Sequence, residues 1–192
     1  GNIWVYPGQD HDENCRRYLA NPKSELPPMA YFSFPSLKDP QWHNRLGAKT
    51  SIDILGVVPF QEFQEWQHTS LKNRPQEYKT RKDELAQPYL EILYRLFPQL
   101  ENKIDHCEVS SPLTVKHYVG WEQGEMYGLD ATPARFQSAG LRPKTPIKNF
   151  WMTGQDTLMA GVCGAMMSGL LTAMAMHPIS TLGQIRQMKK QS

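Results

Sequence analysis

The feature that most constrains this chain is a run of 20 uncharged residues at positions 157–176. Small side chains recur within the run at three- and four-residue spacing, so one face of a helix formed there would carry no bulky group. The remaining positions are bulky and apolar. A bare helix face of this kind lets another backbone or a flat ligand approach closely. The small residues are Gly161, Ala165, Ser168, Gly169 and Thr172.

Three structures fit the run 157–176: a plain core helix, a helix that cradles a ligand, and a membrane span. Its length meets the roughly 20 residues that a span needs, and small residues at this spacing also pack membrane helices together. Against a span, the run is rich in Gly, Ala and Met and has no Trp or Tyr at its far end, where interfacial anchors are expected. The spacing alone leaves all three structures open.

The segment before the run predicts a sharp entry into the helix. Residues 150–152 are apolar and aromatic, which favours a short buried strand. Gly154 then allows a tight turn, and Asp156 is expected at the mouth of that turn. The first amides of a helix have no intrahelical partner and favour negative charge. The whole segment therefore predicts a strand, a glycine turn and a helix start suited to contact between backbone and ligand.

Composition excludes several kinds of function. A net charge of +2 with no basic block before the tail gives no reason to expect a nucleic-acid partner. Cys15, Cys107 and Cys163 are widely spaced and form no C-x-x-C pair, which indicates neither a zinc site nor a disulfide framework and favours a reducing compartment. His11 lies among acidic residues, but consecutive residues rarely converge on one ion. We therefore expect a solvated loop over residues 9–24 and no metal site.

The rest of the chain predicts alternating short strands and helices. No Ser-His-Asp, Cys-His or paired-carboxylate pattern stands out, so catalytic residues are left unassigned. Pro88 lies inside the longest helical segment and is expected to kink or split it, and Arg81 is expected on its water-facing side. The expected strands are 3–6, 29–34, 51–59 and 104–109, and the expected helices are 61–66, 75–97, 112–118, 132–136 and a basic amphipathic tail, 179–190.

Residues 153–156 and 161–169 together resemble the C-terminal FAD-binding motif of the flavin amine oxidoreductase superfamily. The shared pattern is a strand ending in Thr-Gly, an acidic residue, then Gly-x-x-Gly-Ala-x-x-Ser-Gly opening a helix. The similarity is strongest to the branch that holds phytoene desaturases, carotenoid isomerases and retinol-saturase-like proteins, the last of these most of all. It extends over residues 31–176 and includes the segments 34–39, 58–60, 96–100, 111–114, 125–130 and 141–147.

The resemblance implies an α+β (α/β) fold class in three parts. Residues 1–146 are expected to belong to a mixed-sheet substrate-binding domain with helices. Residues 147–178 are expected to be the closing strand, turn and helix of a Rossmann-like FAD-binding domain, followed by the tail 179–192. The G-x-G-x-x-G turn that usually opens such a domain does not occur in the sequence. We therefore expect the C-terminal portion of a longer enzyme, with a naturally truncated, non-catalytic relative as the alternative.

The resemblance also implies a cofactor site for FAD. Asp156 is expected to hydrogen-bond the ribityl or pyrophosphate region, and the amides of Gly161 and Val162 to face the pyrimidine edge of the flavin. Small residues next in the helix would keep it close to the cofactor. The implied cofactor-binding set is Gly154, Gln155, Asp156, Gly161, Val162, Gly164 and Ala165, and the implied substrate-side residues are Tyr127 and Gly128.

The function implied by the resemblance is an FAD-dependent oxidoreductase that acts on carbon–carbon double bonds of a polyene or isoprenoid lipid, with NAD(P)H as a candidate electron donor. The alternatives are a non-catalytic lipid-binding or interaction domain and a small membrane protein anchored by residues 157–176. The expected partners are the lipid substrate, the upstream part of the enzyme and, through the basic tail, a membrane surface. An ordinary surface helix is the favoured alternative for that tail. The expected location is the cytoplasm or a cytosol-facing membrane such as the endoplasmic reticulum.

Overall fold

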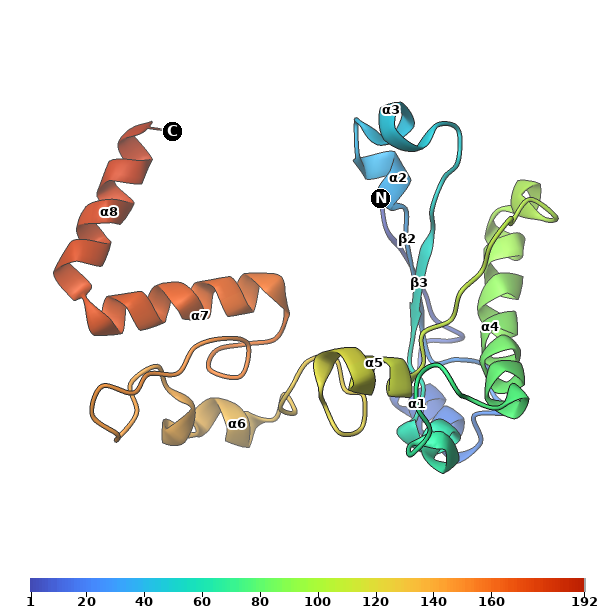
Figure 1. Ribbon diagram of the computed structural model, residues 1–192, viewed down its shortest axis with the longest axis horizontal. Helices are drawn as coiled ribbons and strands as arrows, with labels where there is room; N and C mark the ends of the chain where they lie inside the picture. Colours follow the sequence, from blue (N-terminus) through green and yellow to red (C-terminus); the bar gives the residue numbers. More distant parts are fainter. Residues whose placement is uncertain (192) are drawn as a thin grey trace. The chain divides into compact units, whose positions relative to one another are not determined.

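The chain forms two compact units, Gly1–Gly124 and Glu125–Ser192 (Figure 1). The computed structural model describes residues 1–191, with the side chains of all of these except 185 and 188–191. The first unit combines a small sheet with helices, and the second consists of helices and connecting turns. This mixture confirms the predicted α+β class.

A three-stranded antiparallel sheet organises the first unit. Its strands are β1 (Ile3–Val5), β2 (Ala30–Ser33) and β3 (Asp53–Gly56), with β2 in the centre. Tyr31 of β2 lies opposite Trp4 on one side and Leu55 on the other. The strands fall within the three segments that the sequence predicted. The fourth predicted strand, 104–109, is wrong, because these residues lie in an irregular, largely exposed segment.

The long helix α4 (Gln76–Leu96) lies beside the sheet (Figure 1) and supplies residues to both apolar clusters of the unit. Its C-terminal half packs Tyr89, Ile92 and Leu93 against the β2 residues Ala30 and Phe32. Its N-terminal half joins a second apolar cluster. Apolar packing on both sides of Pro88 keeps α4 one continuous helix, so the predicted split does not occur. The second cluster contains Phe63, Tyr78, Leu85 and Leu113.

A buried ion pair lies on the same half of α4 as the second cluster. Arg81, predicted to face water, is 9% exposed and pairs with Glu62 and Glu84. Glu62 lies on the 3₁₀ helix η1 (Phe60–Trp66), so the guanidinium joins that helix to α4. A buried guanidinium requires paired acceptors, which explains why this arginine departs from its charged neighbours.

A capped helix replaces the loop predicted over residues 9–24. Helix α1 (His11–Ala20) begins after Asp10, whose carboxylate accepts the Glu13 N–H at 2.9 Å. Acidic residues occupy its first turn and Arg17 its last, both favourable positions in the helix dipole. The acidic residues that suggested a solvated loop are therefore the helix-start signal.

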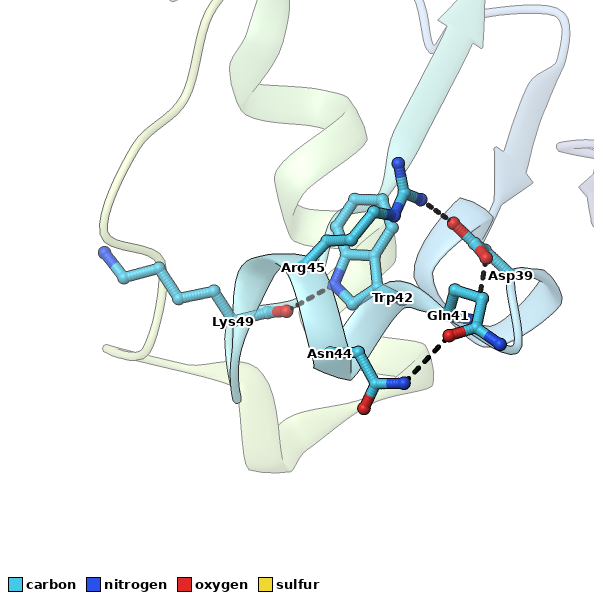
Figure 2. Close-up of polar contacts among 6 residues, drawn as sticks. All are labelled: Asp39, Gln41, Trp42, Asn44, Arg45 and Lys49. Carbon is cyan, nitrogen blue, oxygen red and sulfur yellow. Dashed lines mark hydrogen bonds and ion pairs between the residues drawn. The ribbon is translucent and has the colours of Figure 1, made fainter.

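The connection from β2 to β3 is closed by its own polar contacts (Figure 2). It carries α2 (Pro35–Lys38) and α3 (Trp42–Leu46). The Asp39 carboxylate accepts the Gln41 N–H at 2.9 Å and pairs with Arg45, while the Trp42 indole N–H donates to the Lys49 carbonyl at 2.6 Å. These bonds hold the two short helices together. Two further elements complete the unit, η2 (Pro98–Leu100) and α5 (Pro112–Val119).

The second unit contains α6 (Pro133–Gln137), η3 (Ala139–Leu141), α7 (Gly161–Met176) and α8 (Pro178–Gln191). Helix α7 is the predicted helix, and it starts four residues inside the uncharged run. The strand predicted at 150–152 is wrong: Trp151 makes only an isolated bridge with Lys144. The predicted closing element of a Rossmann-like domain therefore lacks its strand, and its assignment to such a domain stays a prediction. Among residues 1–191, no helix is both long and apolar enough to cross a membrane.

We predict that Gly56→Ala destabilises the chain by about 1–3 kcal/mol, the usual cost of overpacking a filled site. A Cβ at Gly56 would overlap the phenol ring of Tyr89. Urea unfolding followed by tryptophan fluorescence measures the effect. Gly8→Ala, which makes only ordinary van der Waals contact with Asn14, is the control and should change stability by less than about 0.5 kcal/mol. Equal stability of the two variants would contradict the packing.

Burial raises the pKa of Tyr18, against the opposing effect of the nearby Arg81 charge, and burial likewise raises the pKa of Tyr89. Both groups therefore keep their protons in the folded state above about pH 10, where an unfolded tyrosine ionises. The free energy of unfolding should fall as pH rises through that range. Urea midpoints between pH 8 and 11 measure the slope, and Tyr18→Phe should make it shallower. An unchanged slope in Tyr18→Phe would contradict the assignment.

Candidate functional site

The turn that precedes helix α7 packs against a stripe of small residues on that helix. Gly164, Ser168 and Thr172, one per turn, are its buried positions. The Ser168 hydroxyl accepts the Gly154 N–H at 3.0 Å, and the Thr172 hydroxyl donates to the Met152 carbonyl at 2.9 Å. Backbone groups of the turn thus find partners on the helix side chains. This arrangement fixes the position of residues 152–154 against the middle of α7.

The packed stripe differs from the one expected from the sequence. Gly161 and Gly169 have open space where a Cβ would lie, whereas a Cβ at Gly164 would overlap the Met159 carbonyl. The close approach of another backbone, predicted from the spacing, is therefore made by the chain's own turn. At the start of the helix, open space remains beside Gly161.

The start of α7 is accessible and uncapped. The N-cap residue, Ala160, offers no side-chain acceptor, and no acidic residue occupies the first turn. Gly161 has a φ of +89°, a conformation that favours glycine, and Val162 is 85% exposed. The first helical amides need acceptors from outside the helix. This combination fits an acceptor-bearing, flat ligand such as the edge of a flavin.

A buried arginine joins the turn to a second loop. The Arg135 side chain is 4% exposed and pairs with Asp156 at 3.7 Å. One of its terminal nitrogens donates to the Gln155 carbonyl at 2.7 Å, and the other to the Leu129 carbonyl. Arg135 thereby connects residues on both sides of α6, the short helix that carries it.

Asp156 brings the predicted cofactor residues and the predicted substrate residues together. The Asp156 carboxylate accepts the Leu129 N–H at 3.0 Å. Gly128 has a φ of +70°, and a Cβ there would overlap that carboxylate. Tyr127, next in the chain, is 56% exposed. Gly128, expected beside the substrate and directly after Tyr127 in the chain, therefore contacts Asp156, expected beside the cofactor.

None of these contacts tests whether the predicted residues bind a cofactor, so their cofactor roles stay predictions. Gly161, Val162, Gly164 and Ala165 lie on the first turns of α7, as the motif requires. Arg135 is a site residue that the sequence did not indicate, since residues 132–136 predict only a helical turn. The one local signal is Thr132, whose hydroxyl accepts the Arg135 N–H at 3.3 Å and caps α6. That signal places the helix but does not indicate what the arginine binds.

Metal-binding geometry gives no second site in the part of the chain that the structure describes. No group of three or more His, Cys, Asp or Glu side chains within residues 1–191 converges on one point. The three cysteines are exposed free thiols.

Known proteins similar to this chain are named as reductases. An all-trans-retinol 13,14-reductase of Rattus norvegicus is 35% identical over 180 residues, which cover 91% of this chain and 30% of that protein. The protein of the same name from Homo sapiens is 34% identical with the same coverage. A Danio rerio protein named inactive all-trans-retinol 13,14-reductase is 31% identical over 88% of this chain. No protein-family model and no solved structure matches the chain.

These similarities place the chain among relatives of oxidoreductases. More narrowly, the chain is a homologue of the retinol-saturase-like proteins, the all-trans-retinol 13,14-reductases. It spans about 30% of the length of the curated relatives that it matches.

We predict that Gly164→Ala and Gly169→Ala, two substitutions on one helix, have opposite effects. Gly164→Ala should destabilise the second unit by about 1–3 kcal/mol, because the added methyl group meets the Met159 carbonyl. Gly169→Ala should stabilise α7 by up to about 1 kcal/mol through higher helix propensity, since nothing lies within 4 Å of the added carbon. Thermal unfolding and limited proteolysis of both variants give the comparison, and equal effects would contradict the seating of the turn.

Proposed function

We propose that this chain is the C-terminal part of an FAD-dependent oxidoreductase that acts on carbon–carbon double bonds of a polyene or isoprenoid lipid. The observation that carries the proposal is the 35% identity, across 91% of the chain, to a protein named for the reduction of all-trans-retinol. The match covers both units. A flavin fits this chemistry because it transfers hydride itself and requires of the protein only position, electrostatics and exclusion of water.

The start of α7 is the proposed contact for the flavin. The uncapped amides near Gly161 and Val162 can donate hydrogen bonds, and the positive end of the helix dipole favours negative charge on a bound ring. The free space beside Gly161 allows a planar group to approach the backbone. Gly154, Gln155 and Asp156 form the adjoining turn and complete the proposed cofactor side.

The substrate side of the proposal is the loop that carries Tyr127 and Gly128. The exposed Tyr127 ring offers apolar surface and a hydroxyl to a polyene alcohol. Since the backbone of this loop is bonded to Asp156, substrate and cofactor residues would keep a fixed spacing. Holding the reacting groups at a fixed spacing is the main contribution that a protein makes to hydride transfer.

The surface of α7 supports the proposal that a further part of the enzyme contacts this chain. The helix is uncharged all round, a pattern typical of a buried helix, yet Val162, Met166, Met167 and Leu171 are exposed. We propose that the upstream part of the enzyme covers this face. NAD(P)H is the proposed electron donor for the flavin.

Helix α8 is the proposed contact with a membrane surface. Ile179 is 87% exposed and Leu182 44% exposed, next to the exposed Arg186. The basic residues 189 and 190 lie outside the described side chains. Apolar and basic residues together favour an anionic lipid surface, so the proposed location is the cytosolic side of a membrane or the adjacent cytoplasm.

The second candidate is a non-catalytic lipid-binding or interaction domain. One specific observation favours it: a relative that is 31% identical to the chain is named inactive. Such a protein would keep the fold and bind a polyene without flavin-dependent turnover.

We predict that the protein at its full natural length purifies yellow, with flavin absorbance that bleaches on reduction. The same protein should reduce all-trans-retinol when supplied with NAD(P)H. A colourless protein that takes up no added FAD but binds all-trans-retinol would contradict the proposal and favour the non-catalytic alternative.

We predict further that Asp156→Ala lowers flavin occupancy in the full-length protein. The substitution removes the carboxylate that is proposed to hydrogen-bond the ribityl or pyrophosphate region of the cofactor, a contact in which Arg135 has no part. The flavin-to-protein absorbance ratio measures the effect. Unchanged occupancy would contradict the role assigned to Asp156.

A further inference from the structure

We infer that Arg135 is a positioning residue that holds the loop 127–129 against the turn 154–156. The inference concerns a residue outside the proposed cofactor and substrate sets. Its link to substrate use rests on the proposed function, whereas its effect on the loop can be measured without any flavin.

Arg135 is placed to hold two segments of the chain together, which an arginine at the surface would not do. Its side chain is 4% exposed, so the guanidinium is removed from water and depends on protein acceptors. Those acceptors are the Leu129 carbonyl, the Gln155 carbonyl and the Asp156 carboxylate. A planar guanidinium can serve several acceptors at fixed angles, which a lysine ammonium cannot reproduce.

The loop is held from its other side by Asp156. The Leu129 N–H donates to Asp156 Oδ1, the oxygen that also faces Arg135. Leu129 is thus bonded at both ends of its backbone, by its N–H to the carboxylate and by its carbonyl to the guanidinium. A Cβ at Gly128 would overlap that carboxylate, which shows that the loop backbone packs directly against Asp156.

The helix side of the site has separate support. The Ser168 and Thr172 hydroxyls bond the backbone of residues 152 and 154, and neither contact involves Arg135. Loss of Arg135 should therefore release the loop 127–129 and leave α7 seated. A substitution that only weakened folding would loosen the loop and α7 together.

The first test is amide hydrogen exchange on the full-length protein, as wild type and as Arg135→Gln. The Leu129 N–H, which donates to Asp156, should exchange at least about tenfold faster, since local opening of the loop no longer breaks the contacts of Arg135, while α7 amides keep their wild-type rates. Arg135→Lys should fall between the two. Arg142→Gln is the matched control, because Arg142 is exposed and touches a single carbonyl, that of Phe136, at 3.3 Å. Unchanged exchange of the Leu129 amide, or equal acceleration in α7, would overturn the inference.

The second test uses steady-state kinetics with all-trans-retinol as the substrate. Arg135→Gln should raise KM by about tenfold, the effect of a misplaced positioning element, with the flavin-to-protein ratio unchanged and partial rescue in Arg135→Lys. A loss of flavin with an unchanged KM would overturn the link to substrate. If the wild type neither holds flavin nor turns over, the proposed function fails, and the exchange experiment still decides whether Arg135 holds the loop.

Discussion

The second unit depends on hydrogen bonds between side chains of α7 and the backbone of the turn before it. The Ser168 and Thr172 hydroxyls satisfy the main-chain groups of Gly154 and Met152, and Gly164 leaves room for the Met159 carbonyl. These contacts fix the position of the turn relative to the helix. Because the turn also carries Asp156, they set where the loop with Tyr127 can attach. A helix rich in small residues is therefore required for reasons internal to the unit, whatever it binds on its open side.

Two buried arginines show how the chain joins segments far apart in sequence. Arg81 connects α4 to η1 through Glu62, and Arg135 connects the loop before α6 to the turn before α7. In each, both terminal nitrogens donate to protein acceptors, as a buried cation requires. Arg81 stabilises the sheet-and-helix unit, far in sequence from any residue proposed to contact cofactor. Arg135 lies between residues proposed to bind cofactor and residues proposed to bind substrate, so its contacts affect the proposed site as well as the fold.

The sequence predicted those elements whose pattern is strong and local. Helix α4 follows from an apolar stripe and α7 from small residues at three- and four-residue spacing. Helix α5 lies over the predicted segment 112–118, and Ser111 caps it. Helix α1 was missed because its capping acid, Asp10, was interpreted as part of a solvated loop. The strand at 104–109 was predicted from a loose alternation and the strand at 150–152 from a short apolar run. Such patterns form strands only when a partner edge is present. Arg135 could not be found, since its acceptors are backbone groups brought together by the fold.

The central claim is that the open start of α7 brings main-chain amides to a flavin. An experimental structure of the full-length protein purified with its cofactor tests this claim most directly. The account predicts density for the isoalloxazine ring beside the backbone of Gly161 and Val162, with the turn at Gly154 next to it. Density for another protein segment filling that space, or a flavin bound elsewhere in the molecule, would contradict it.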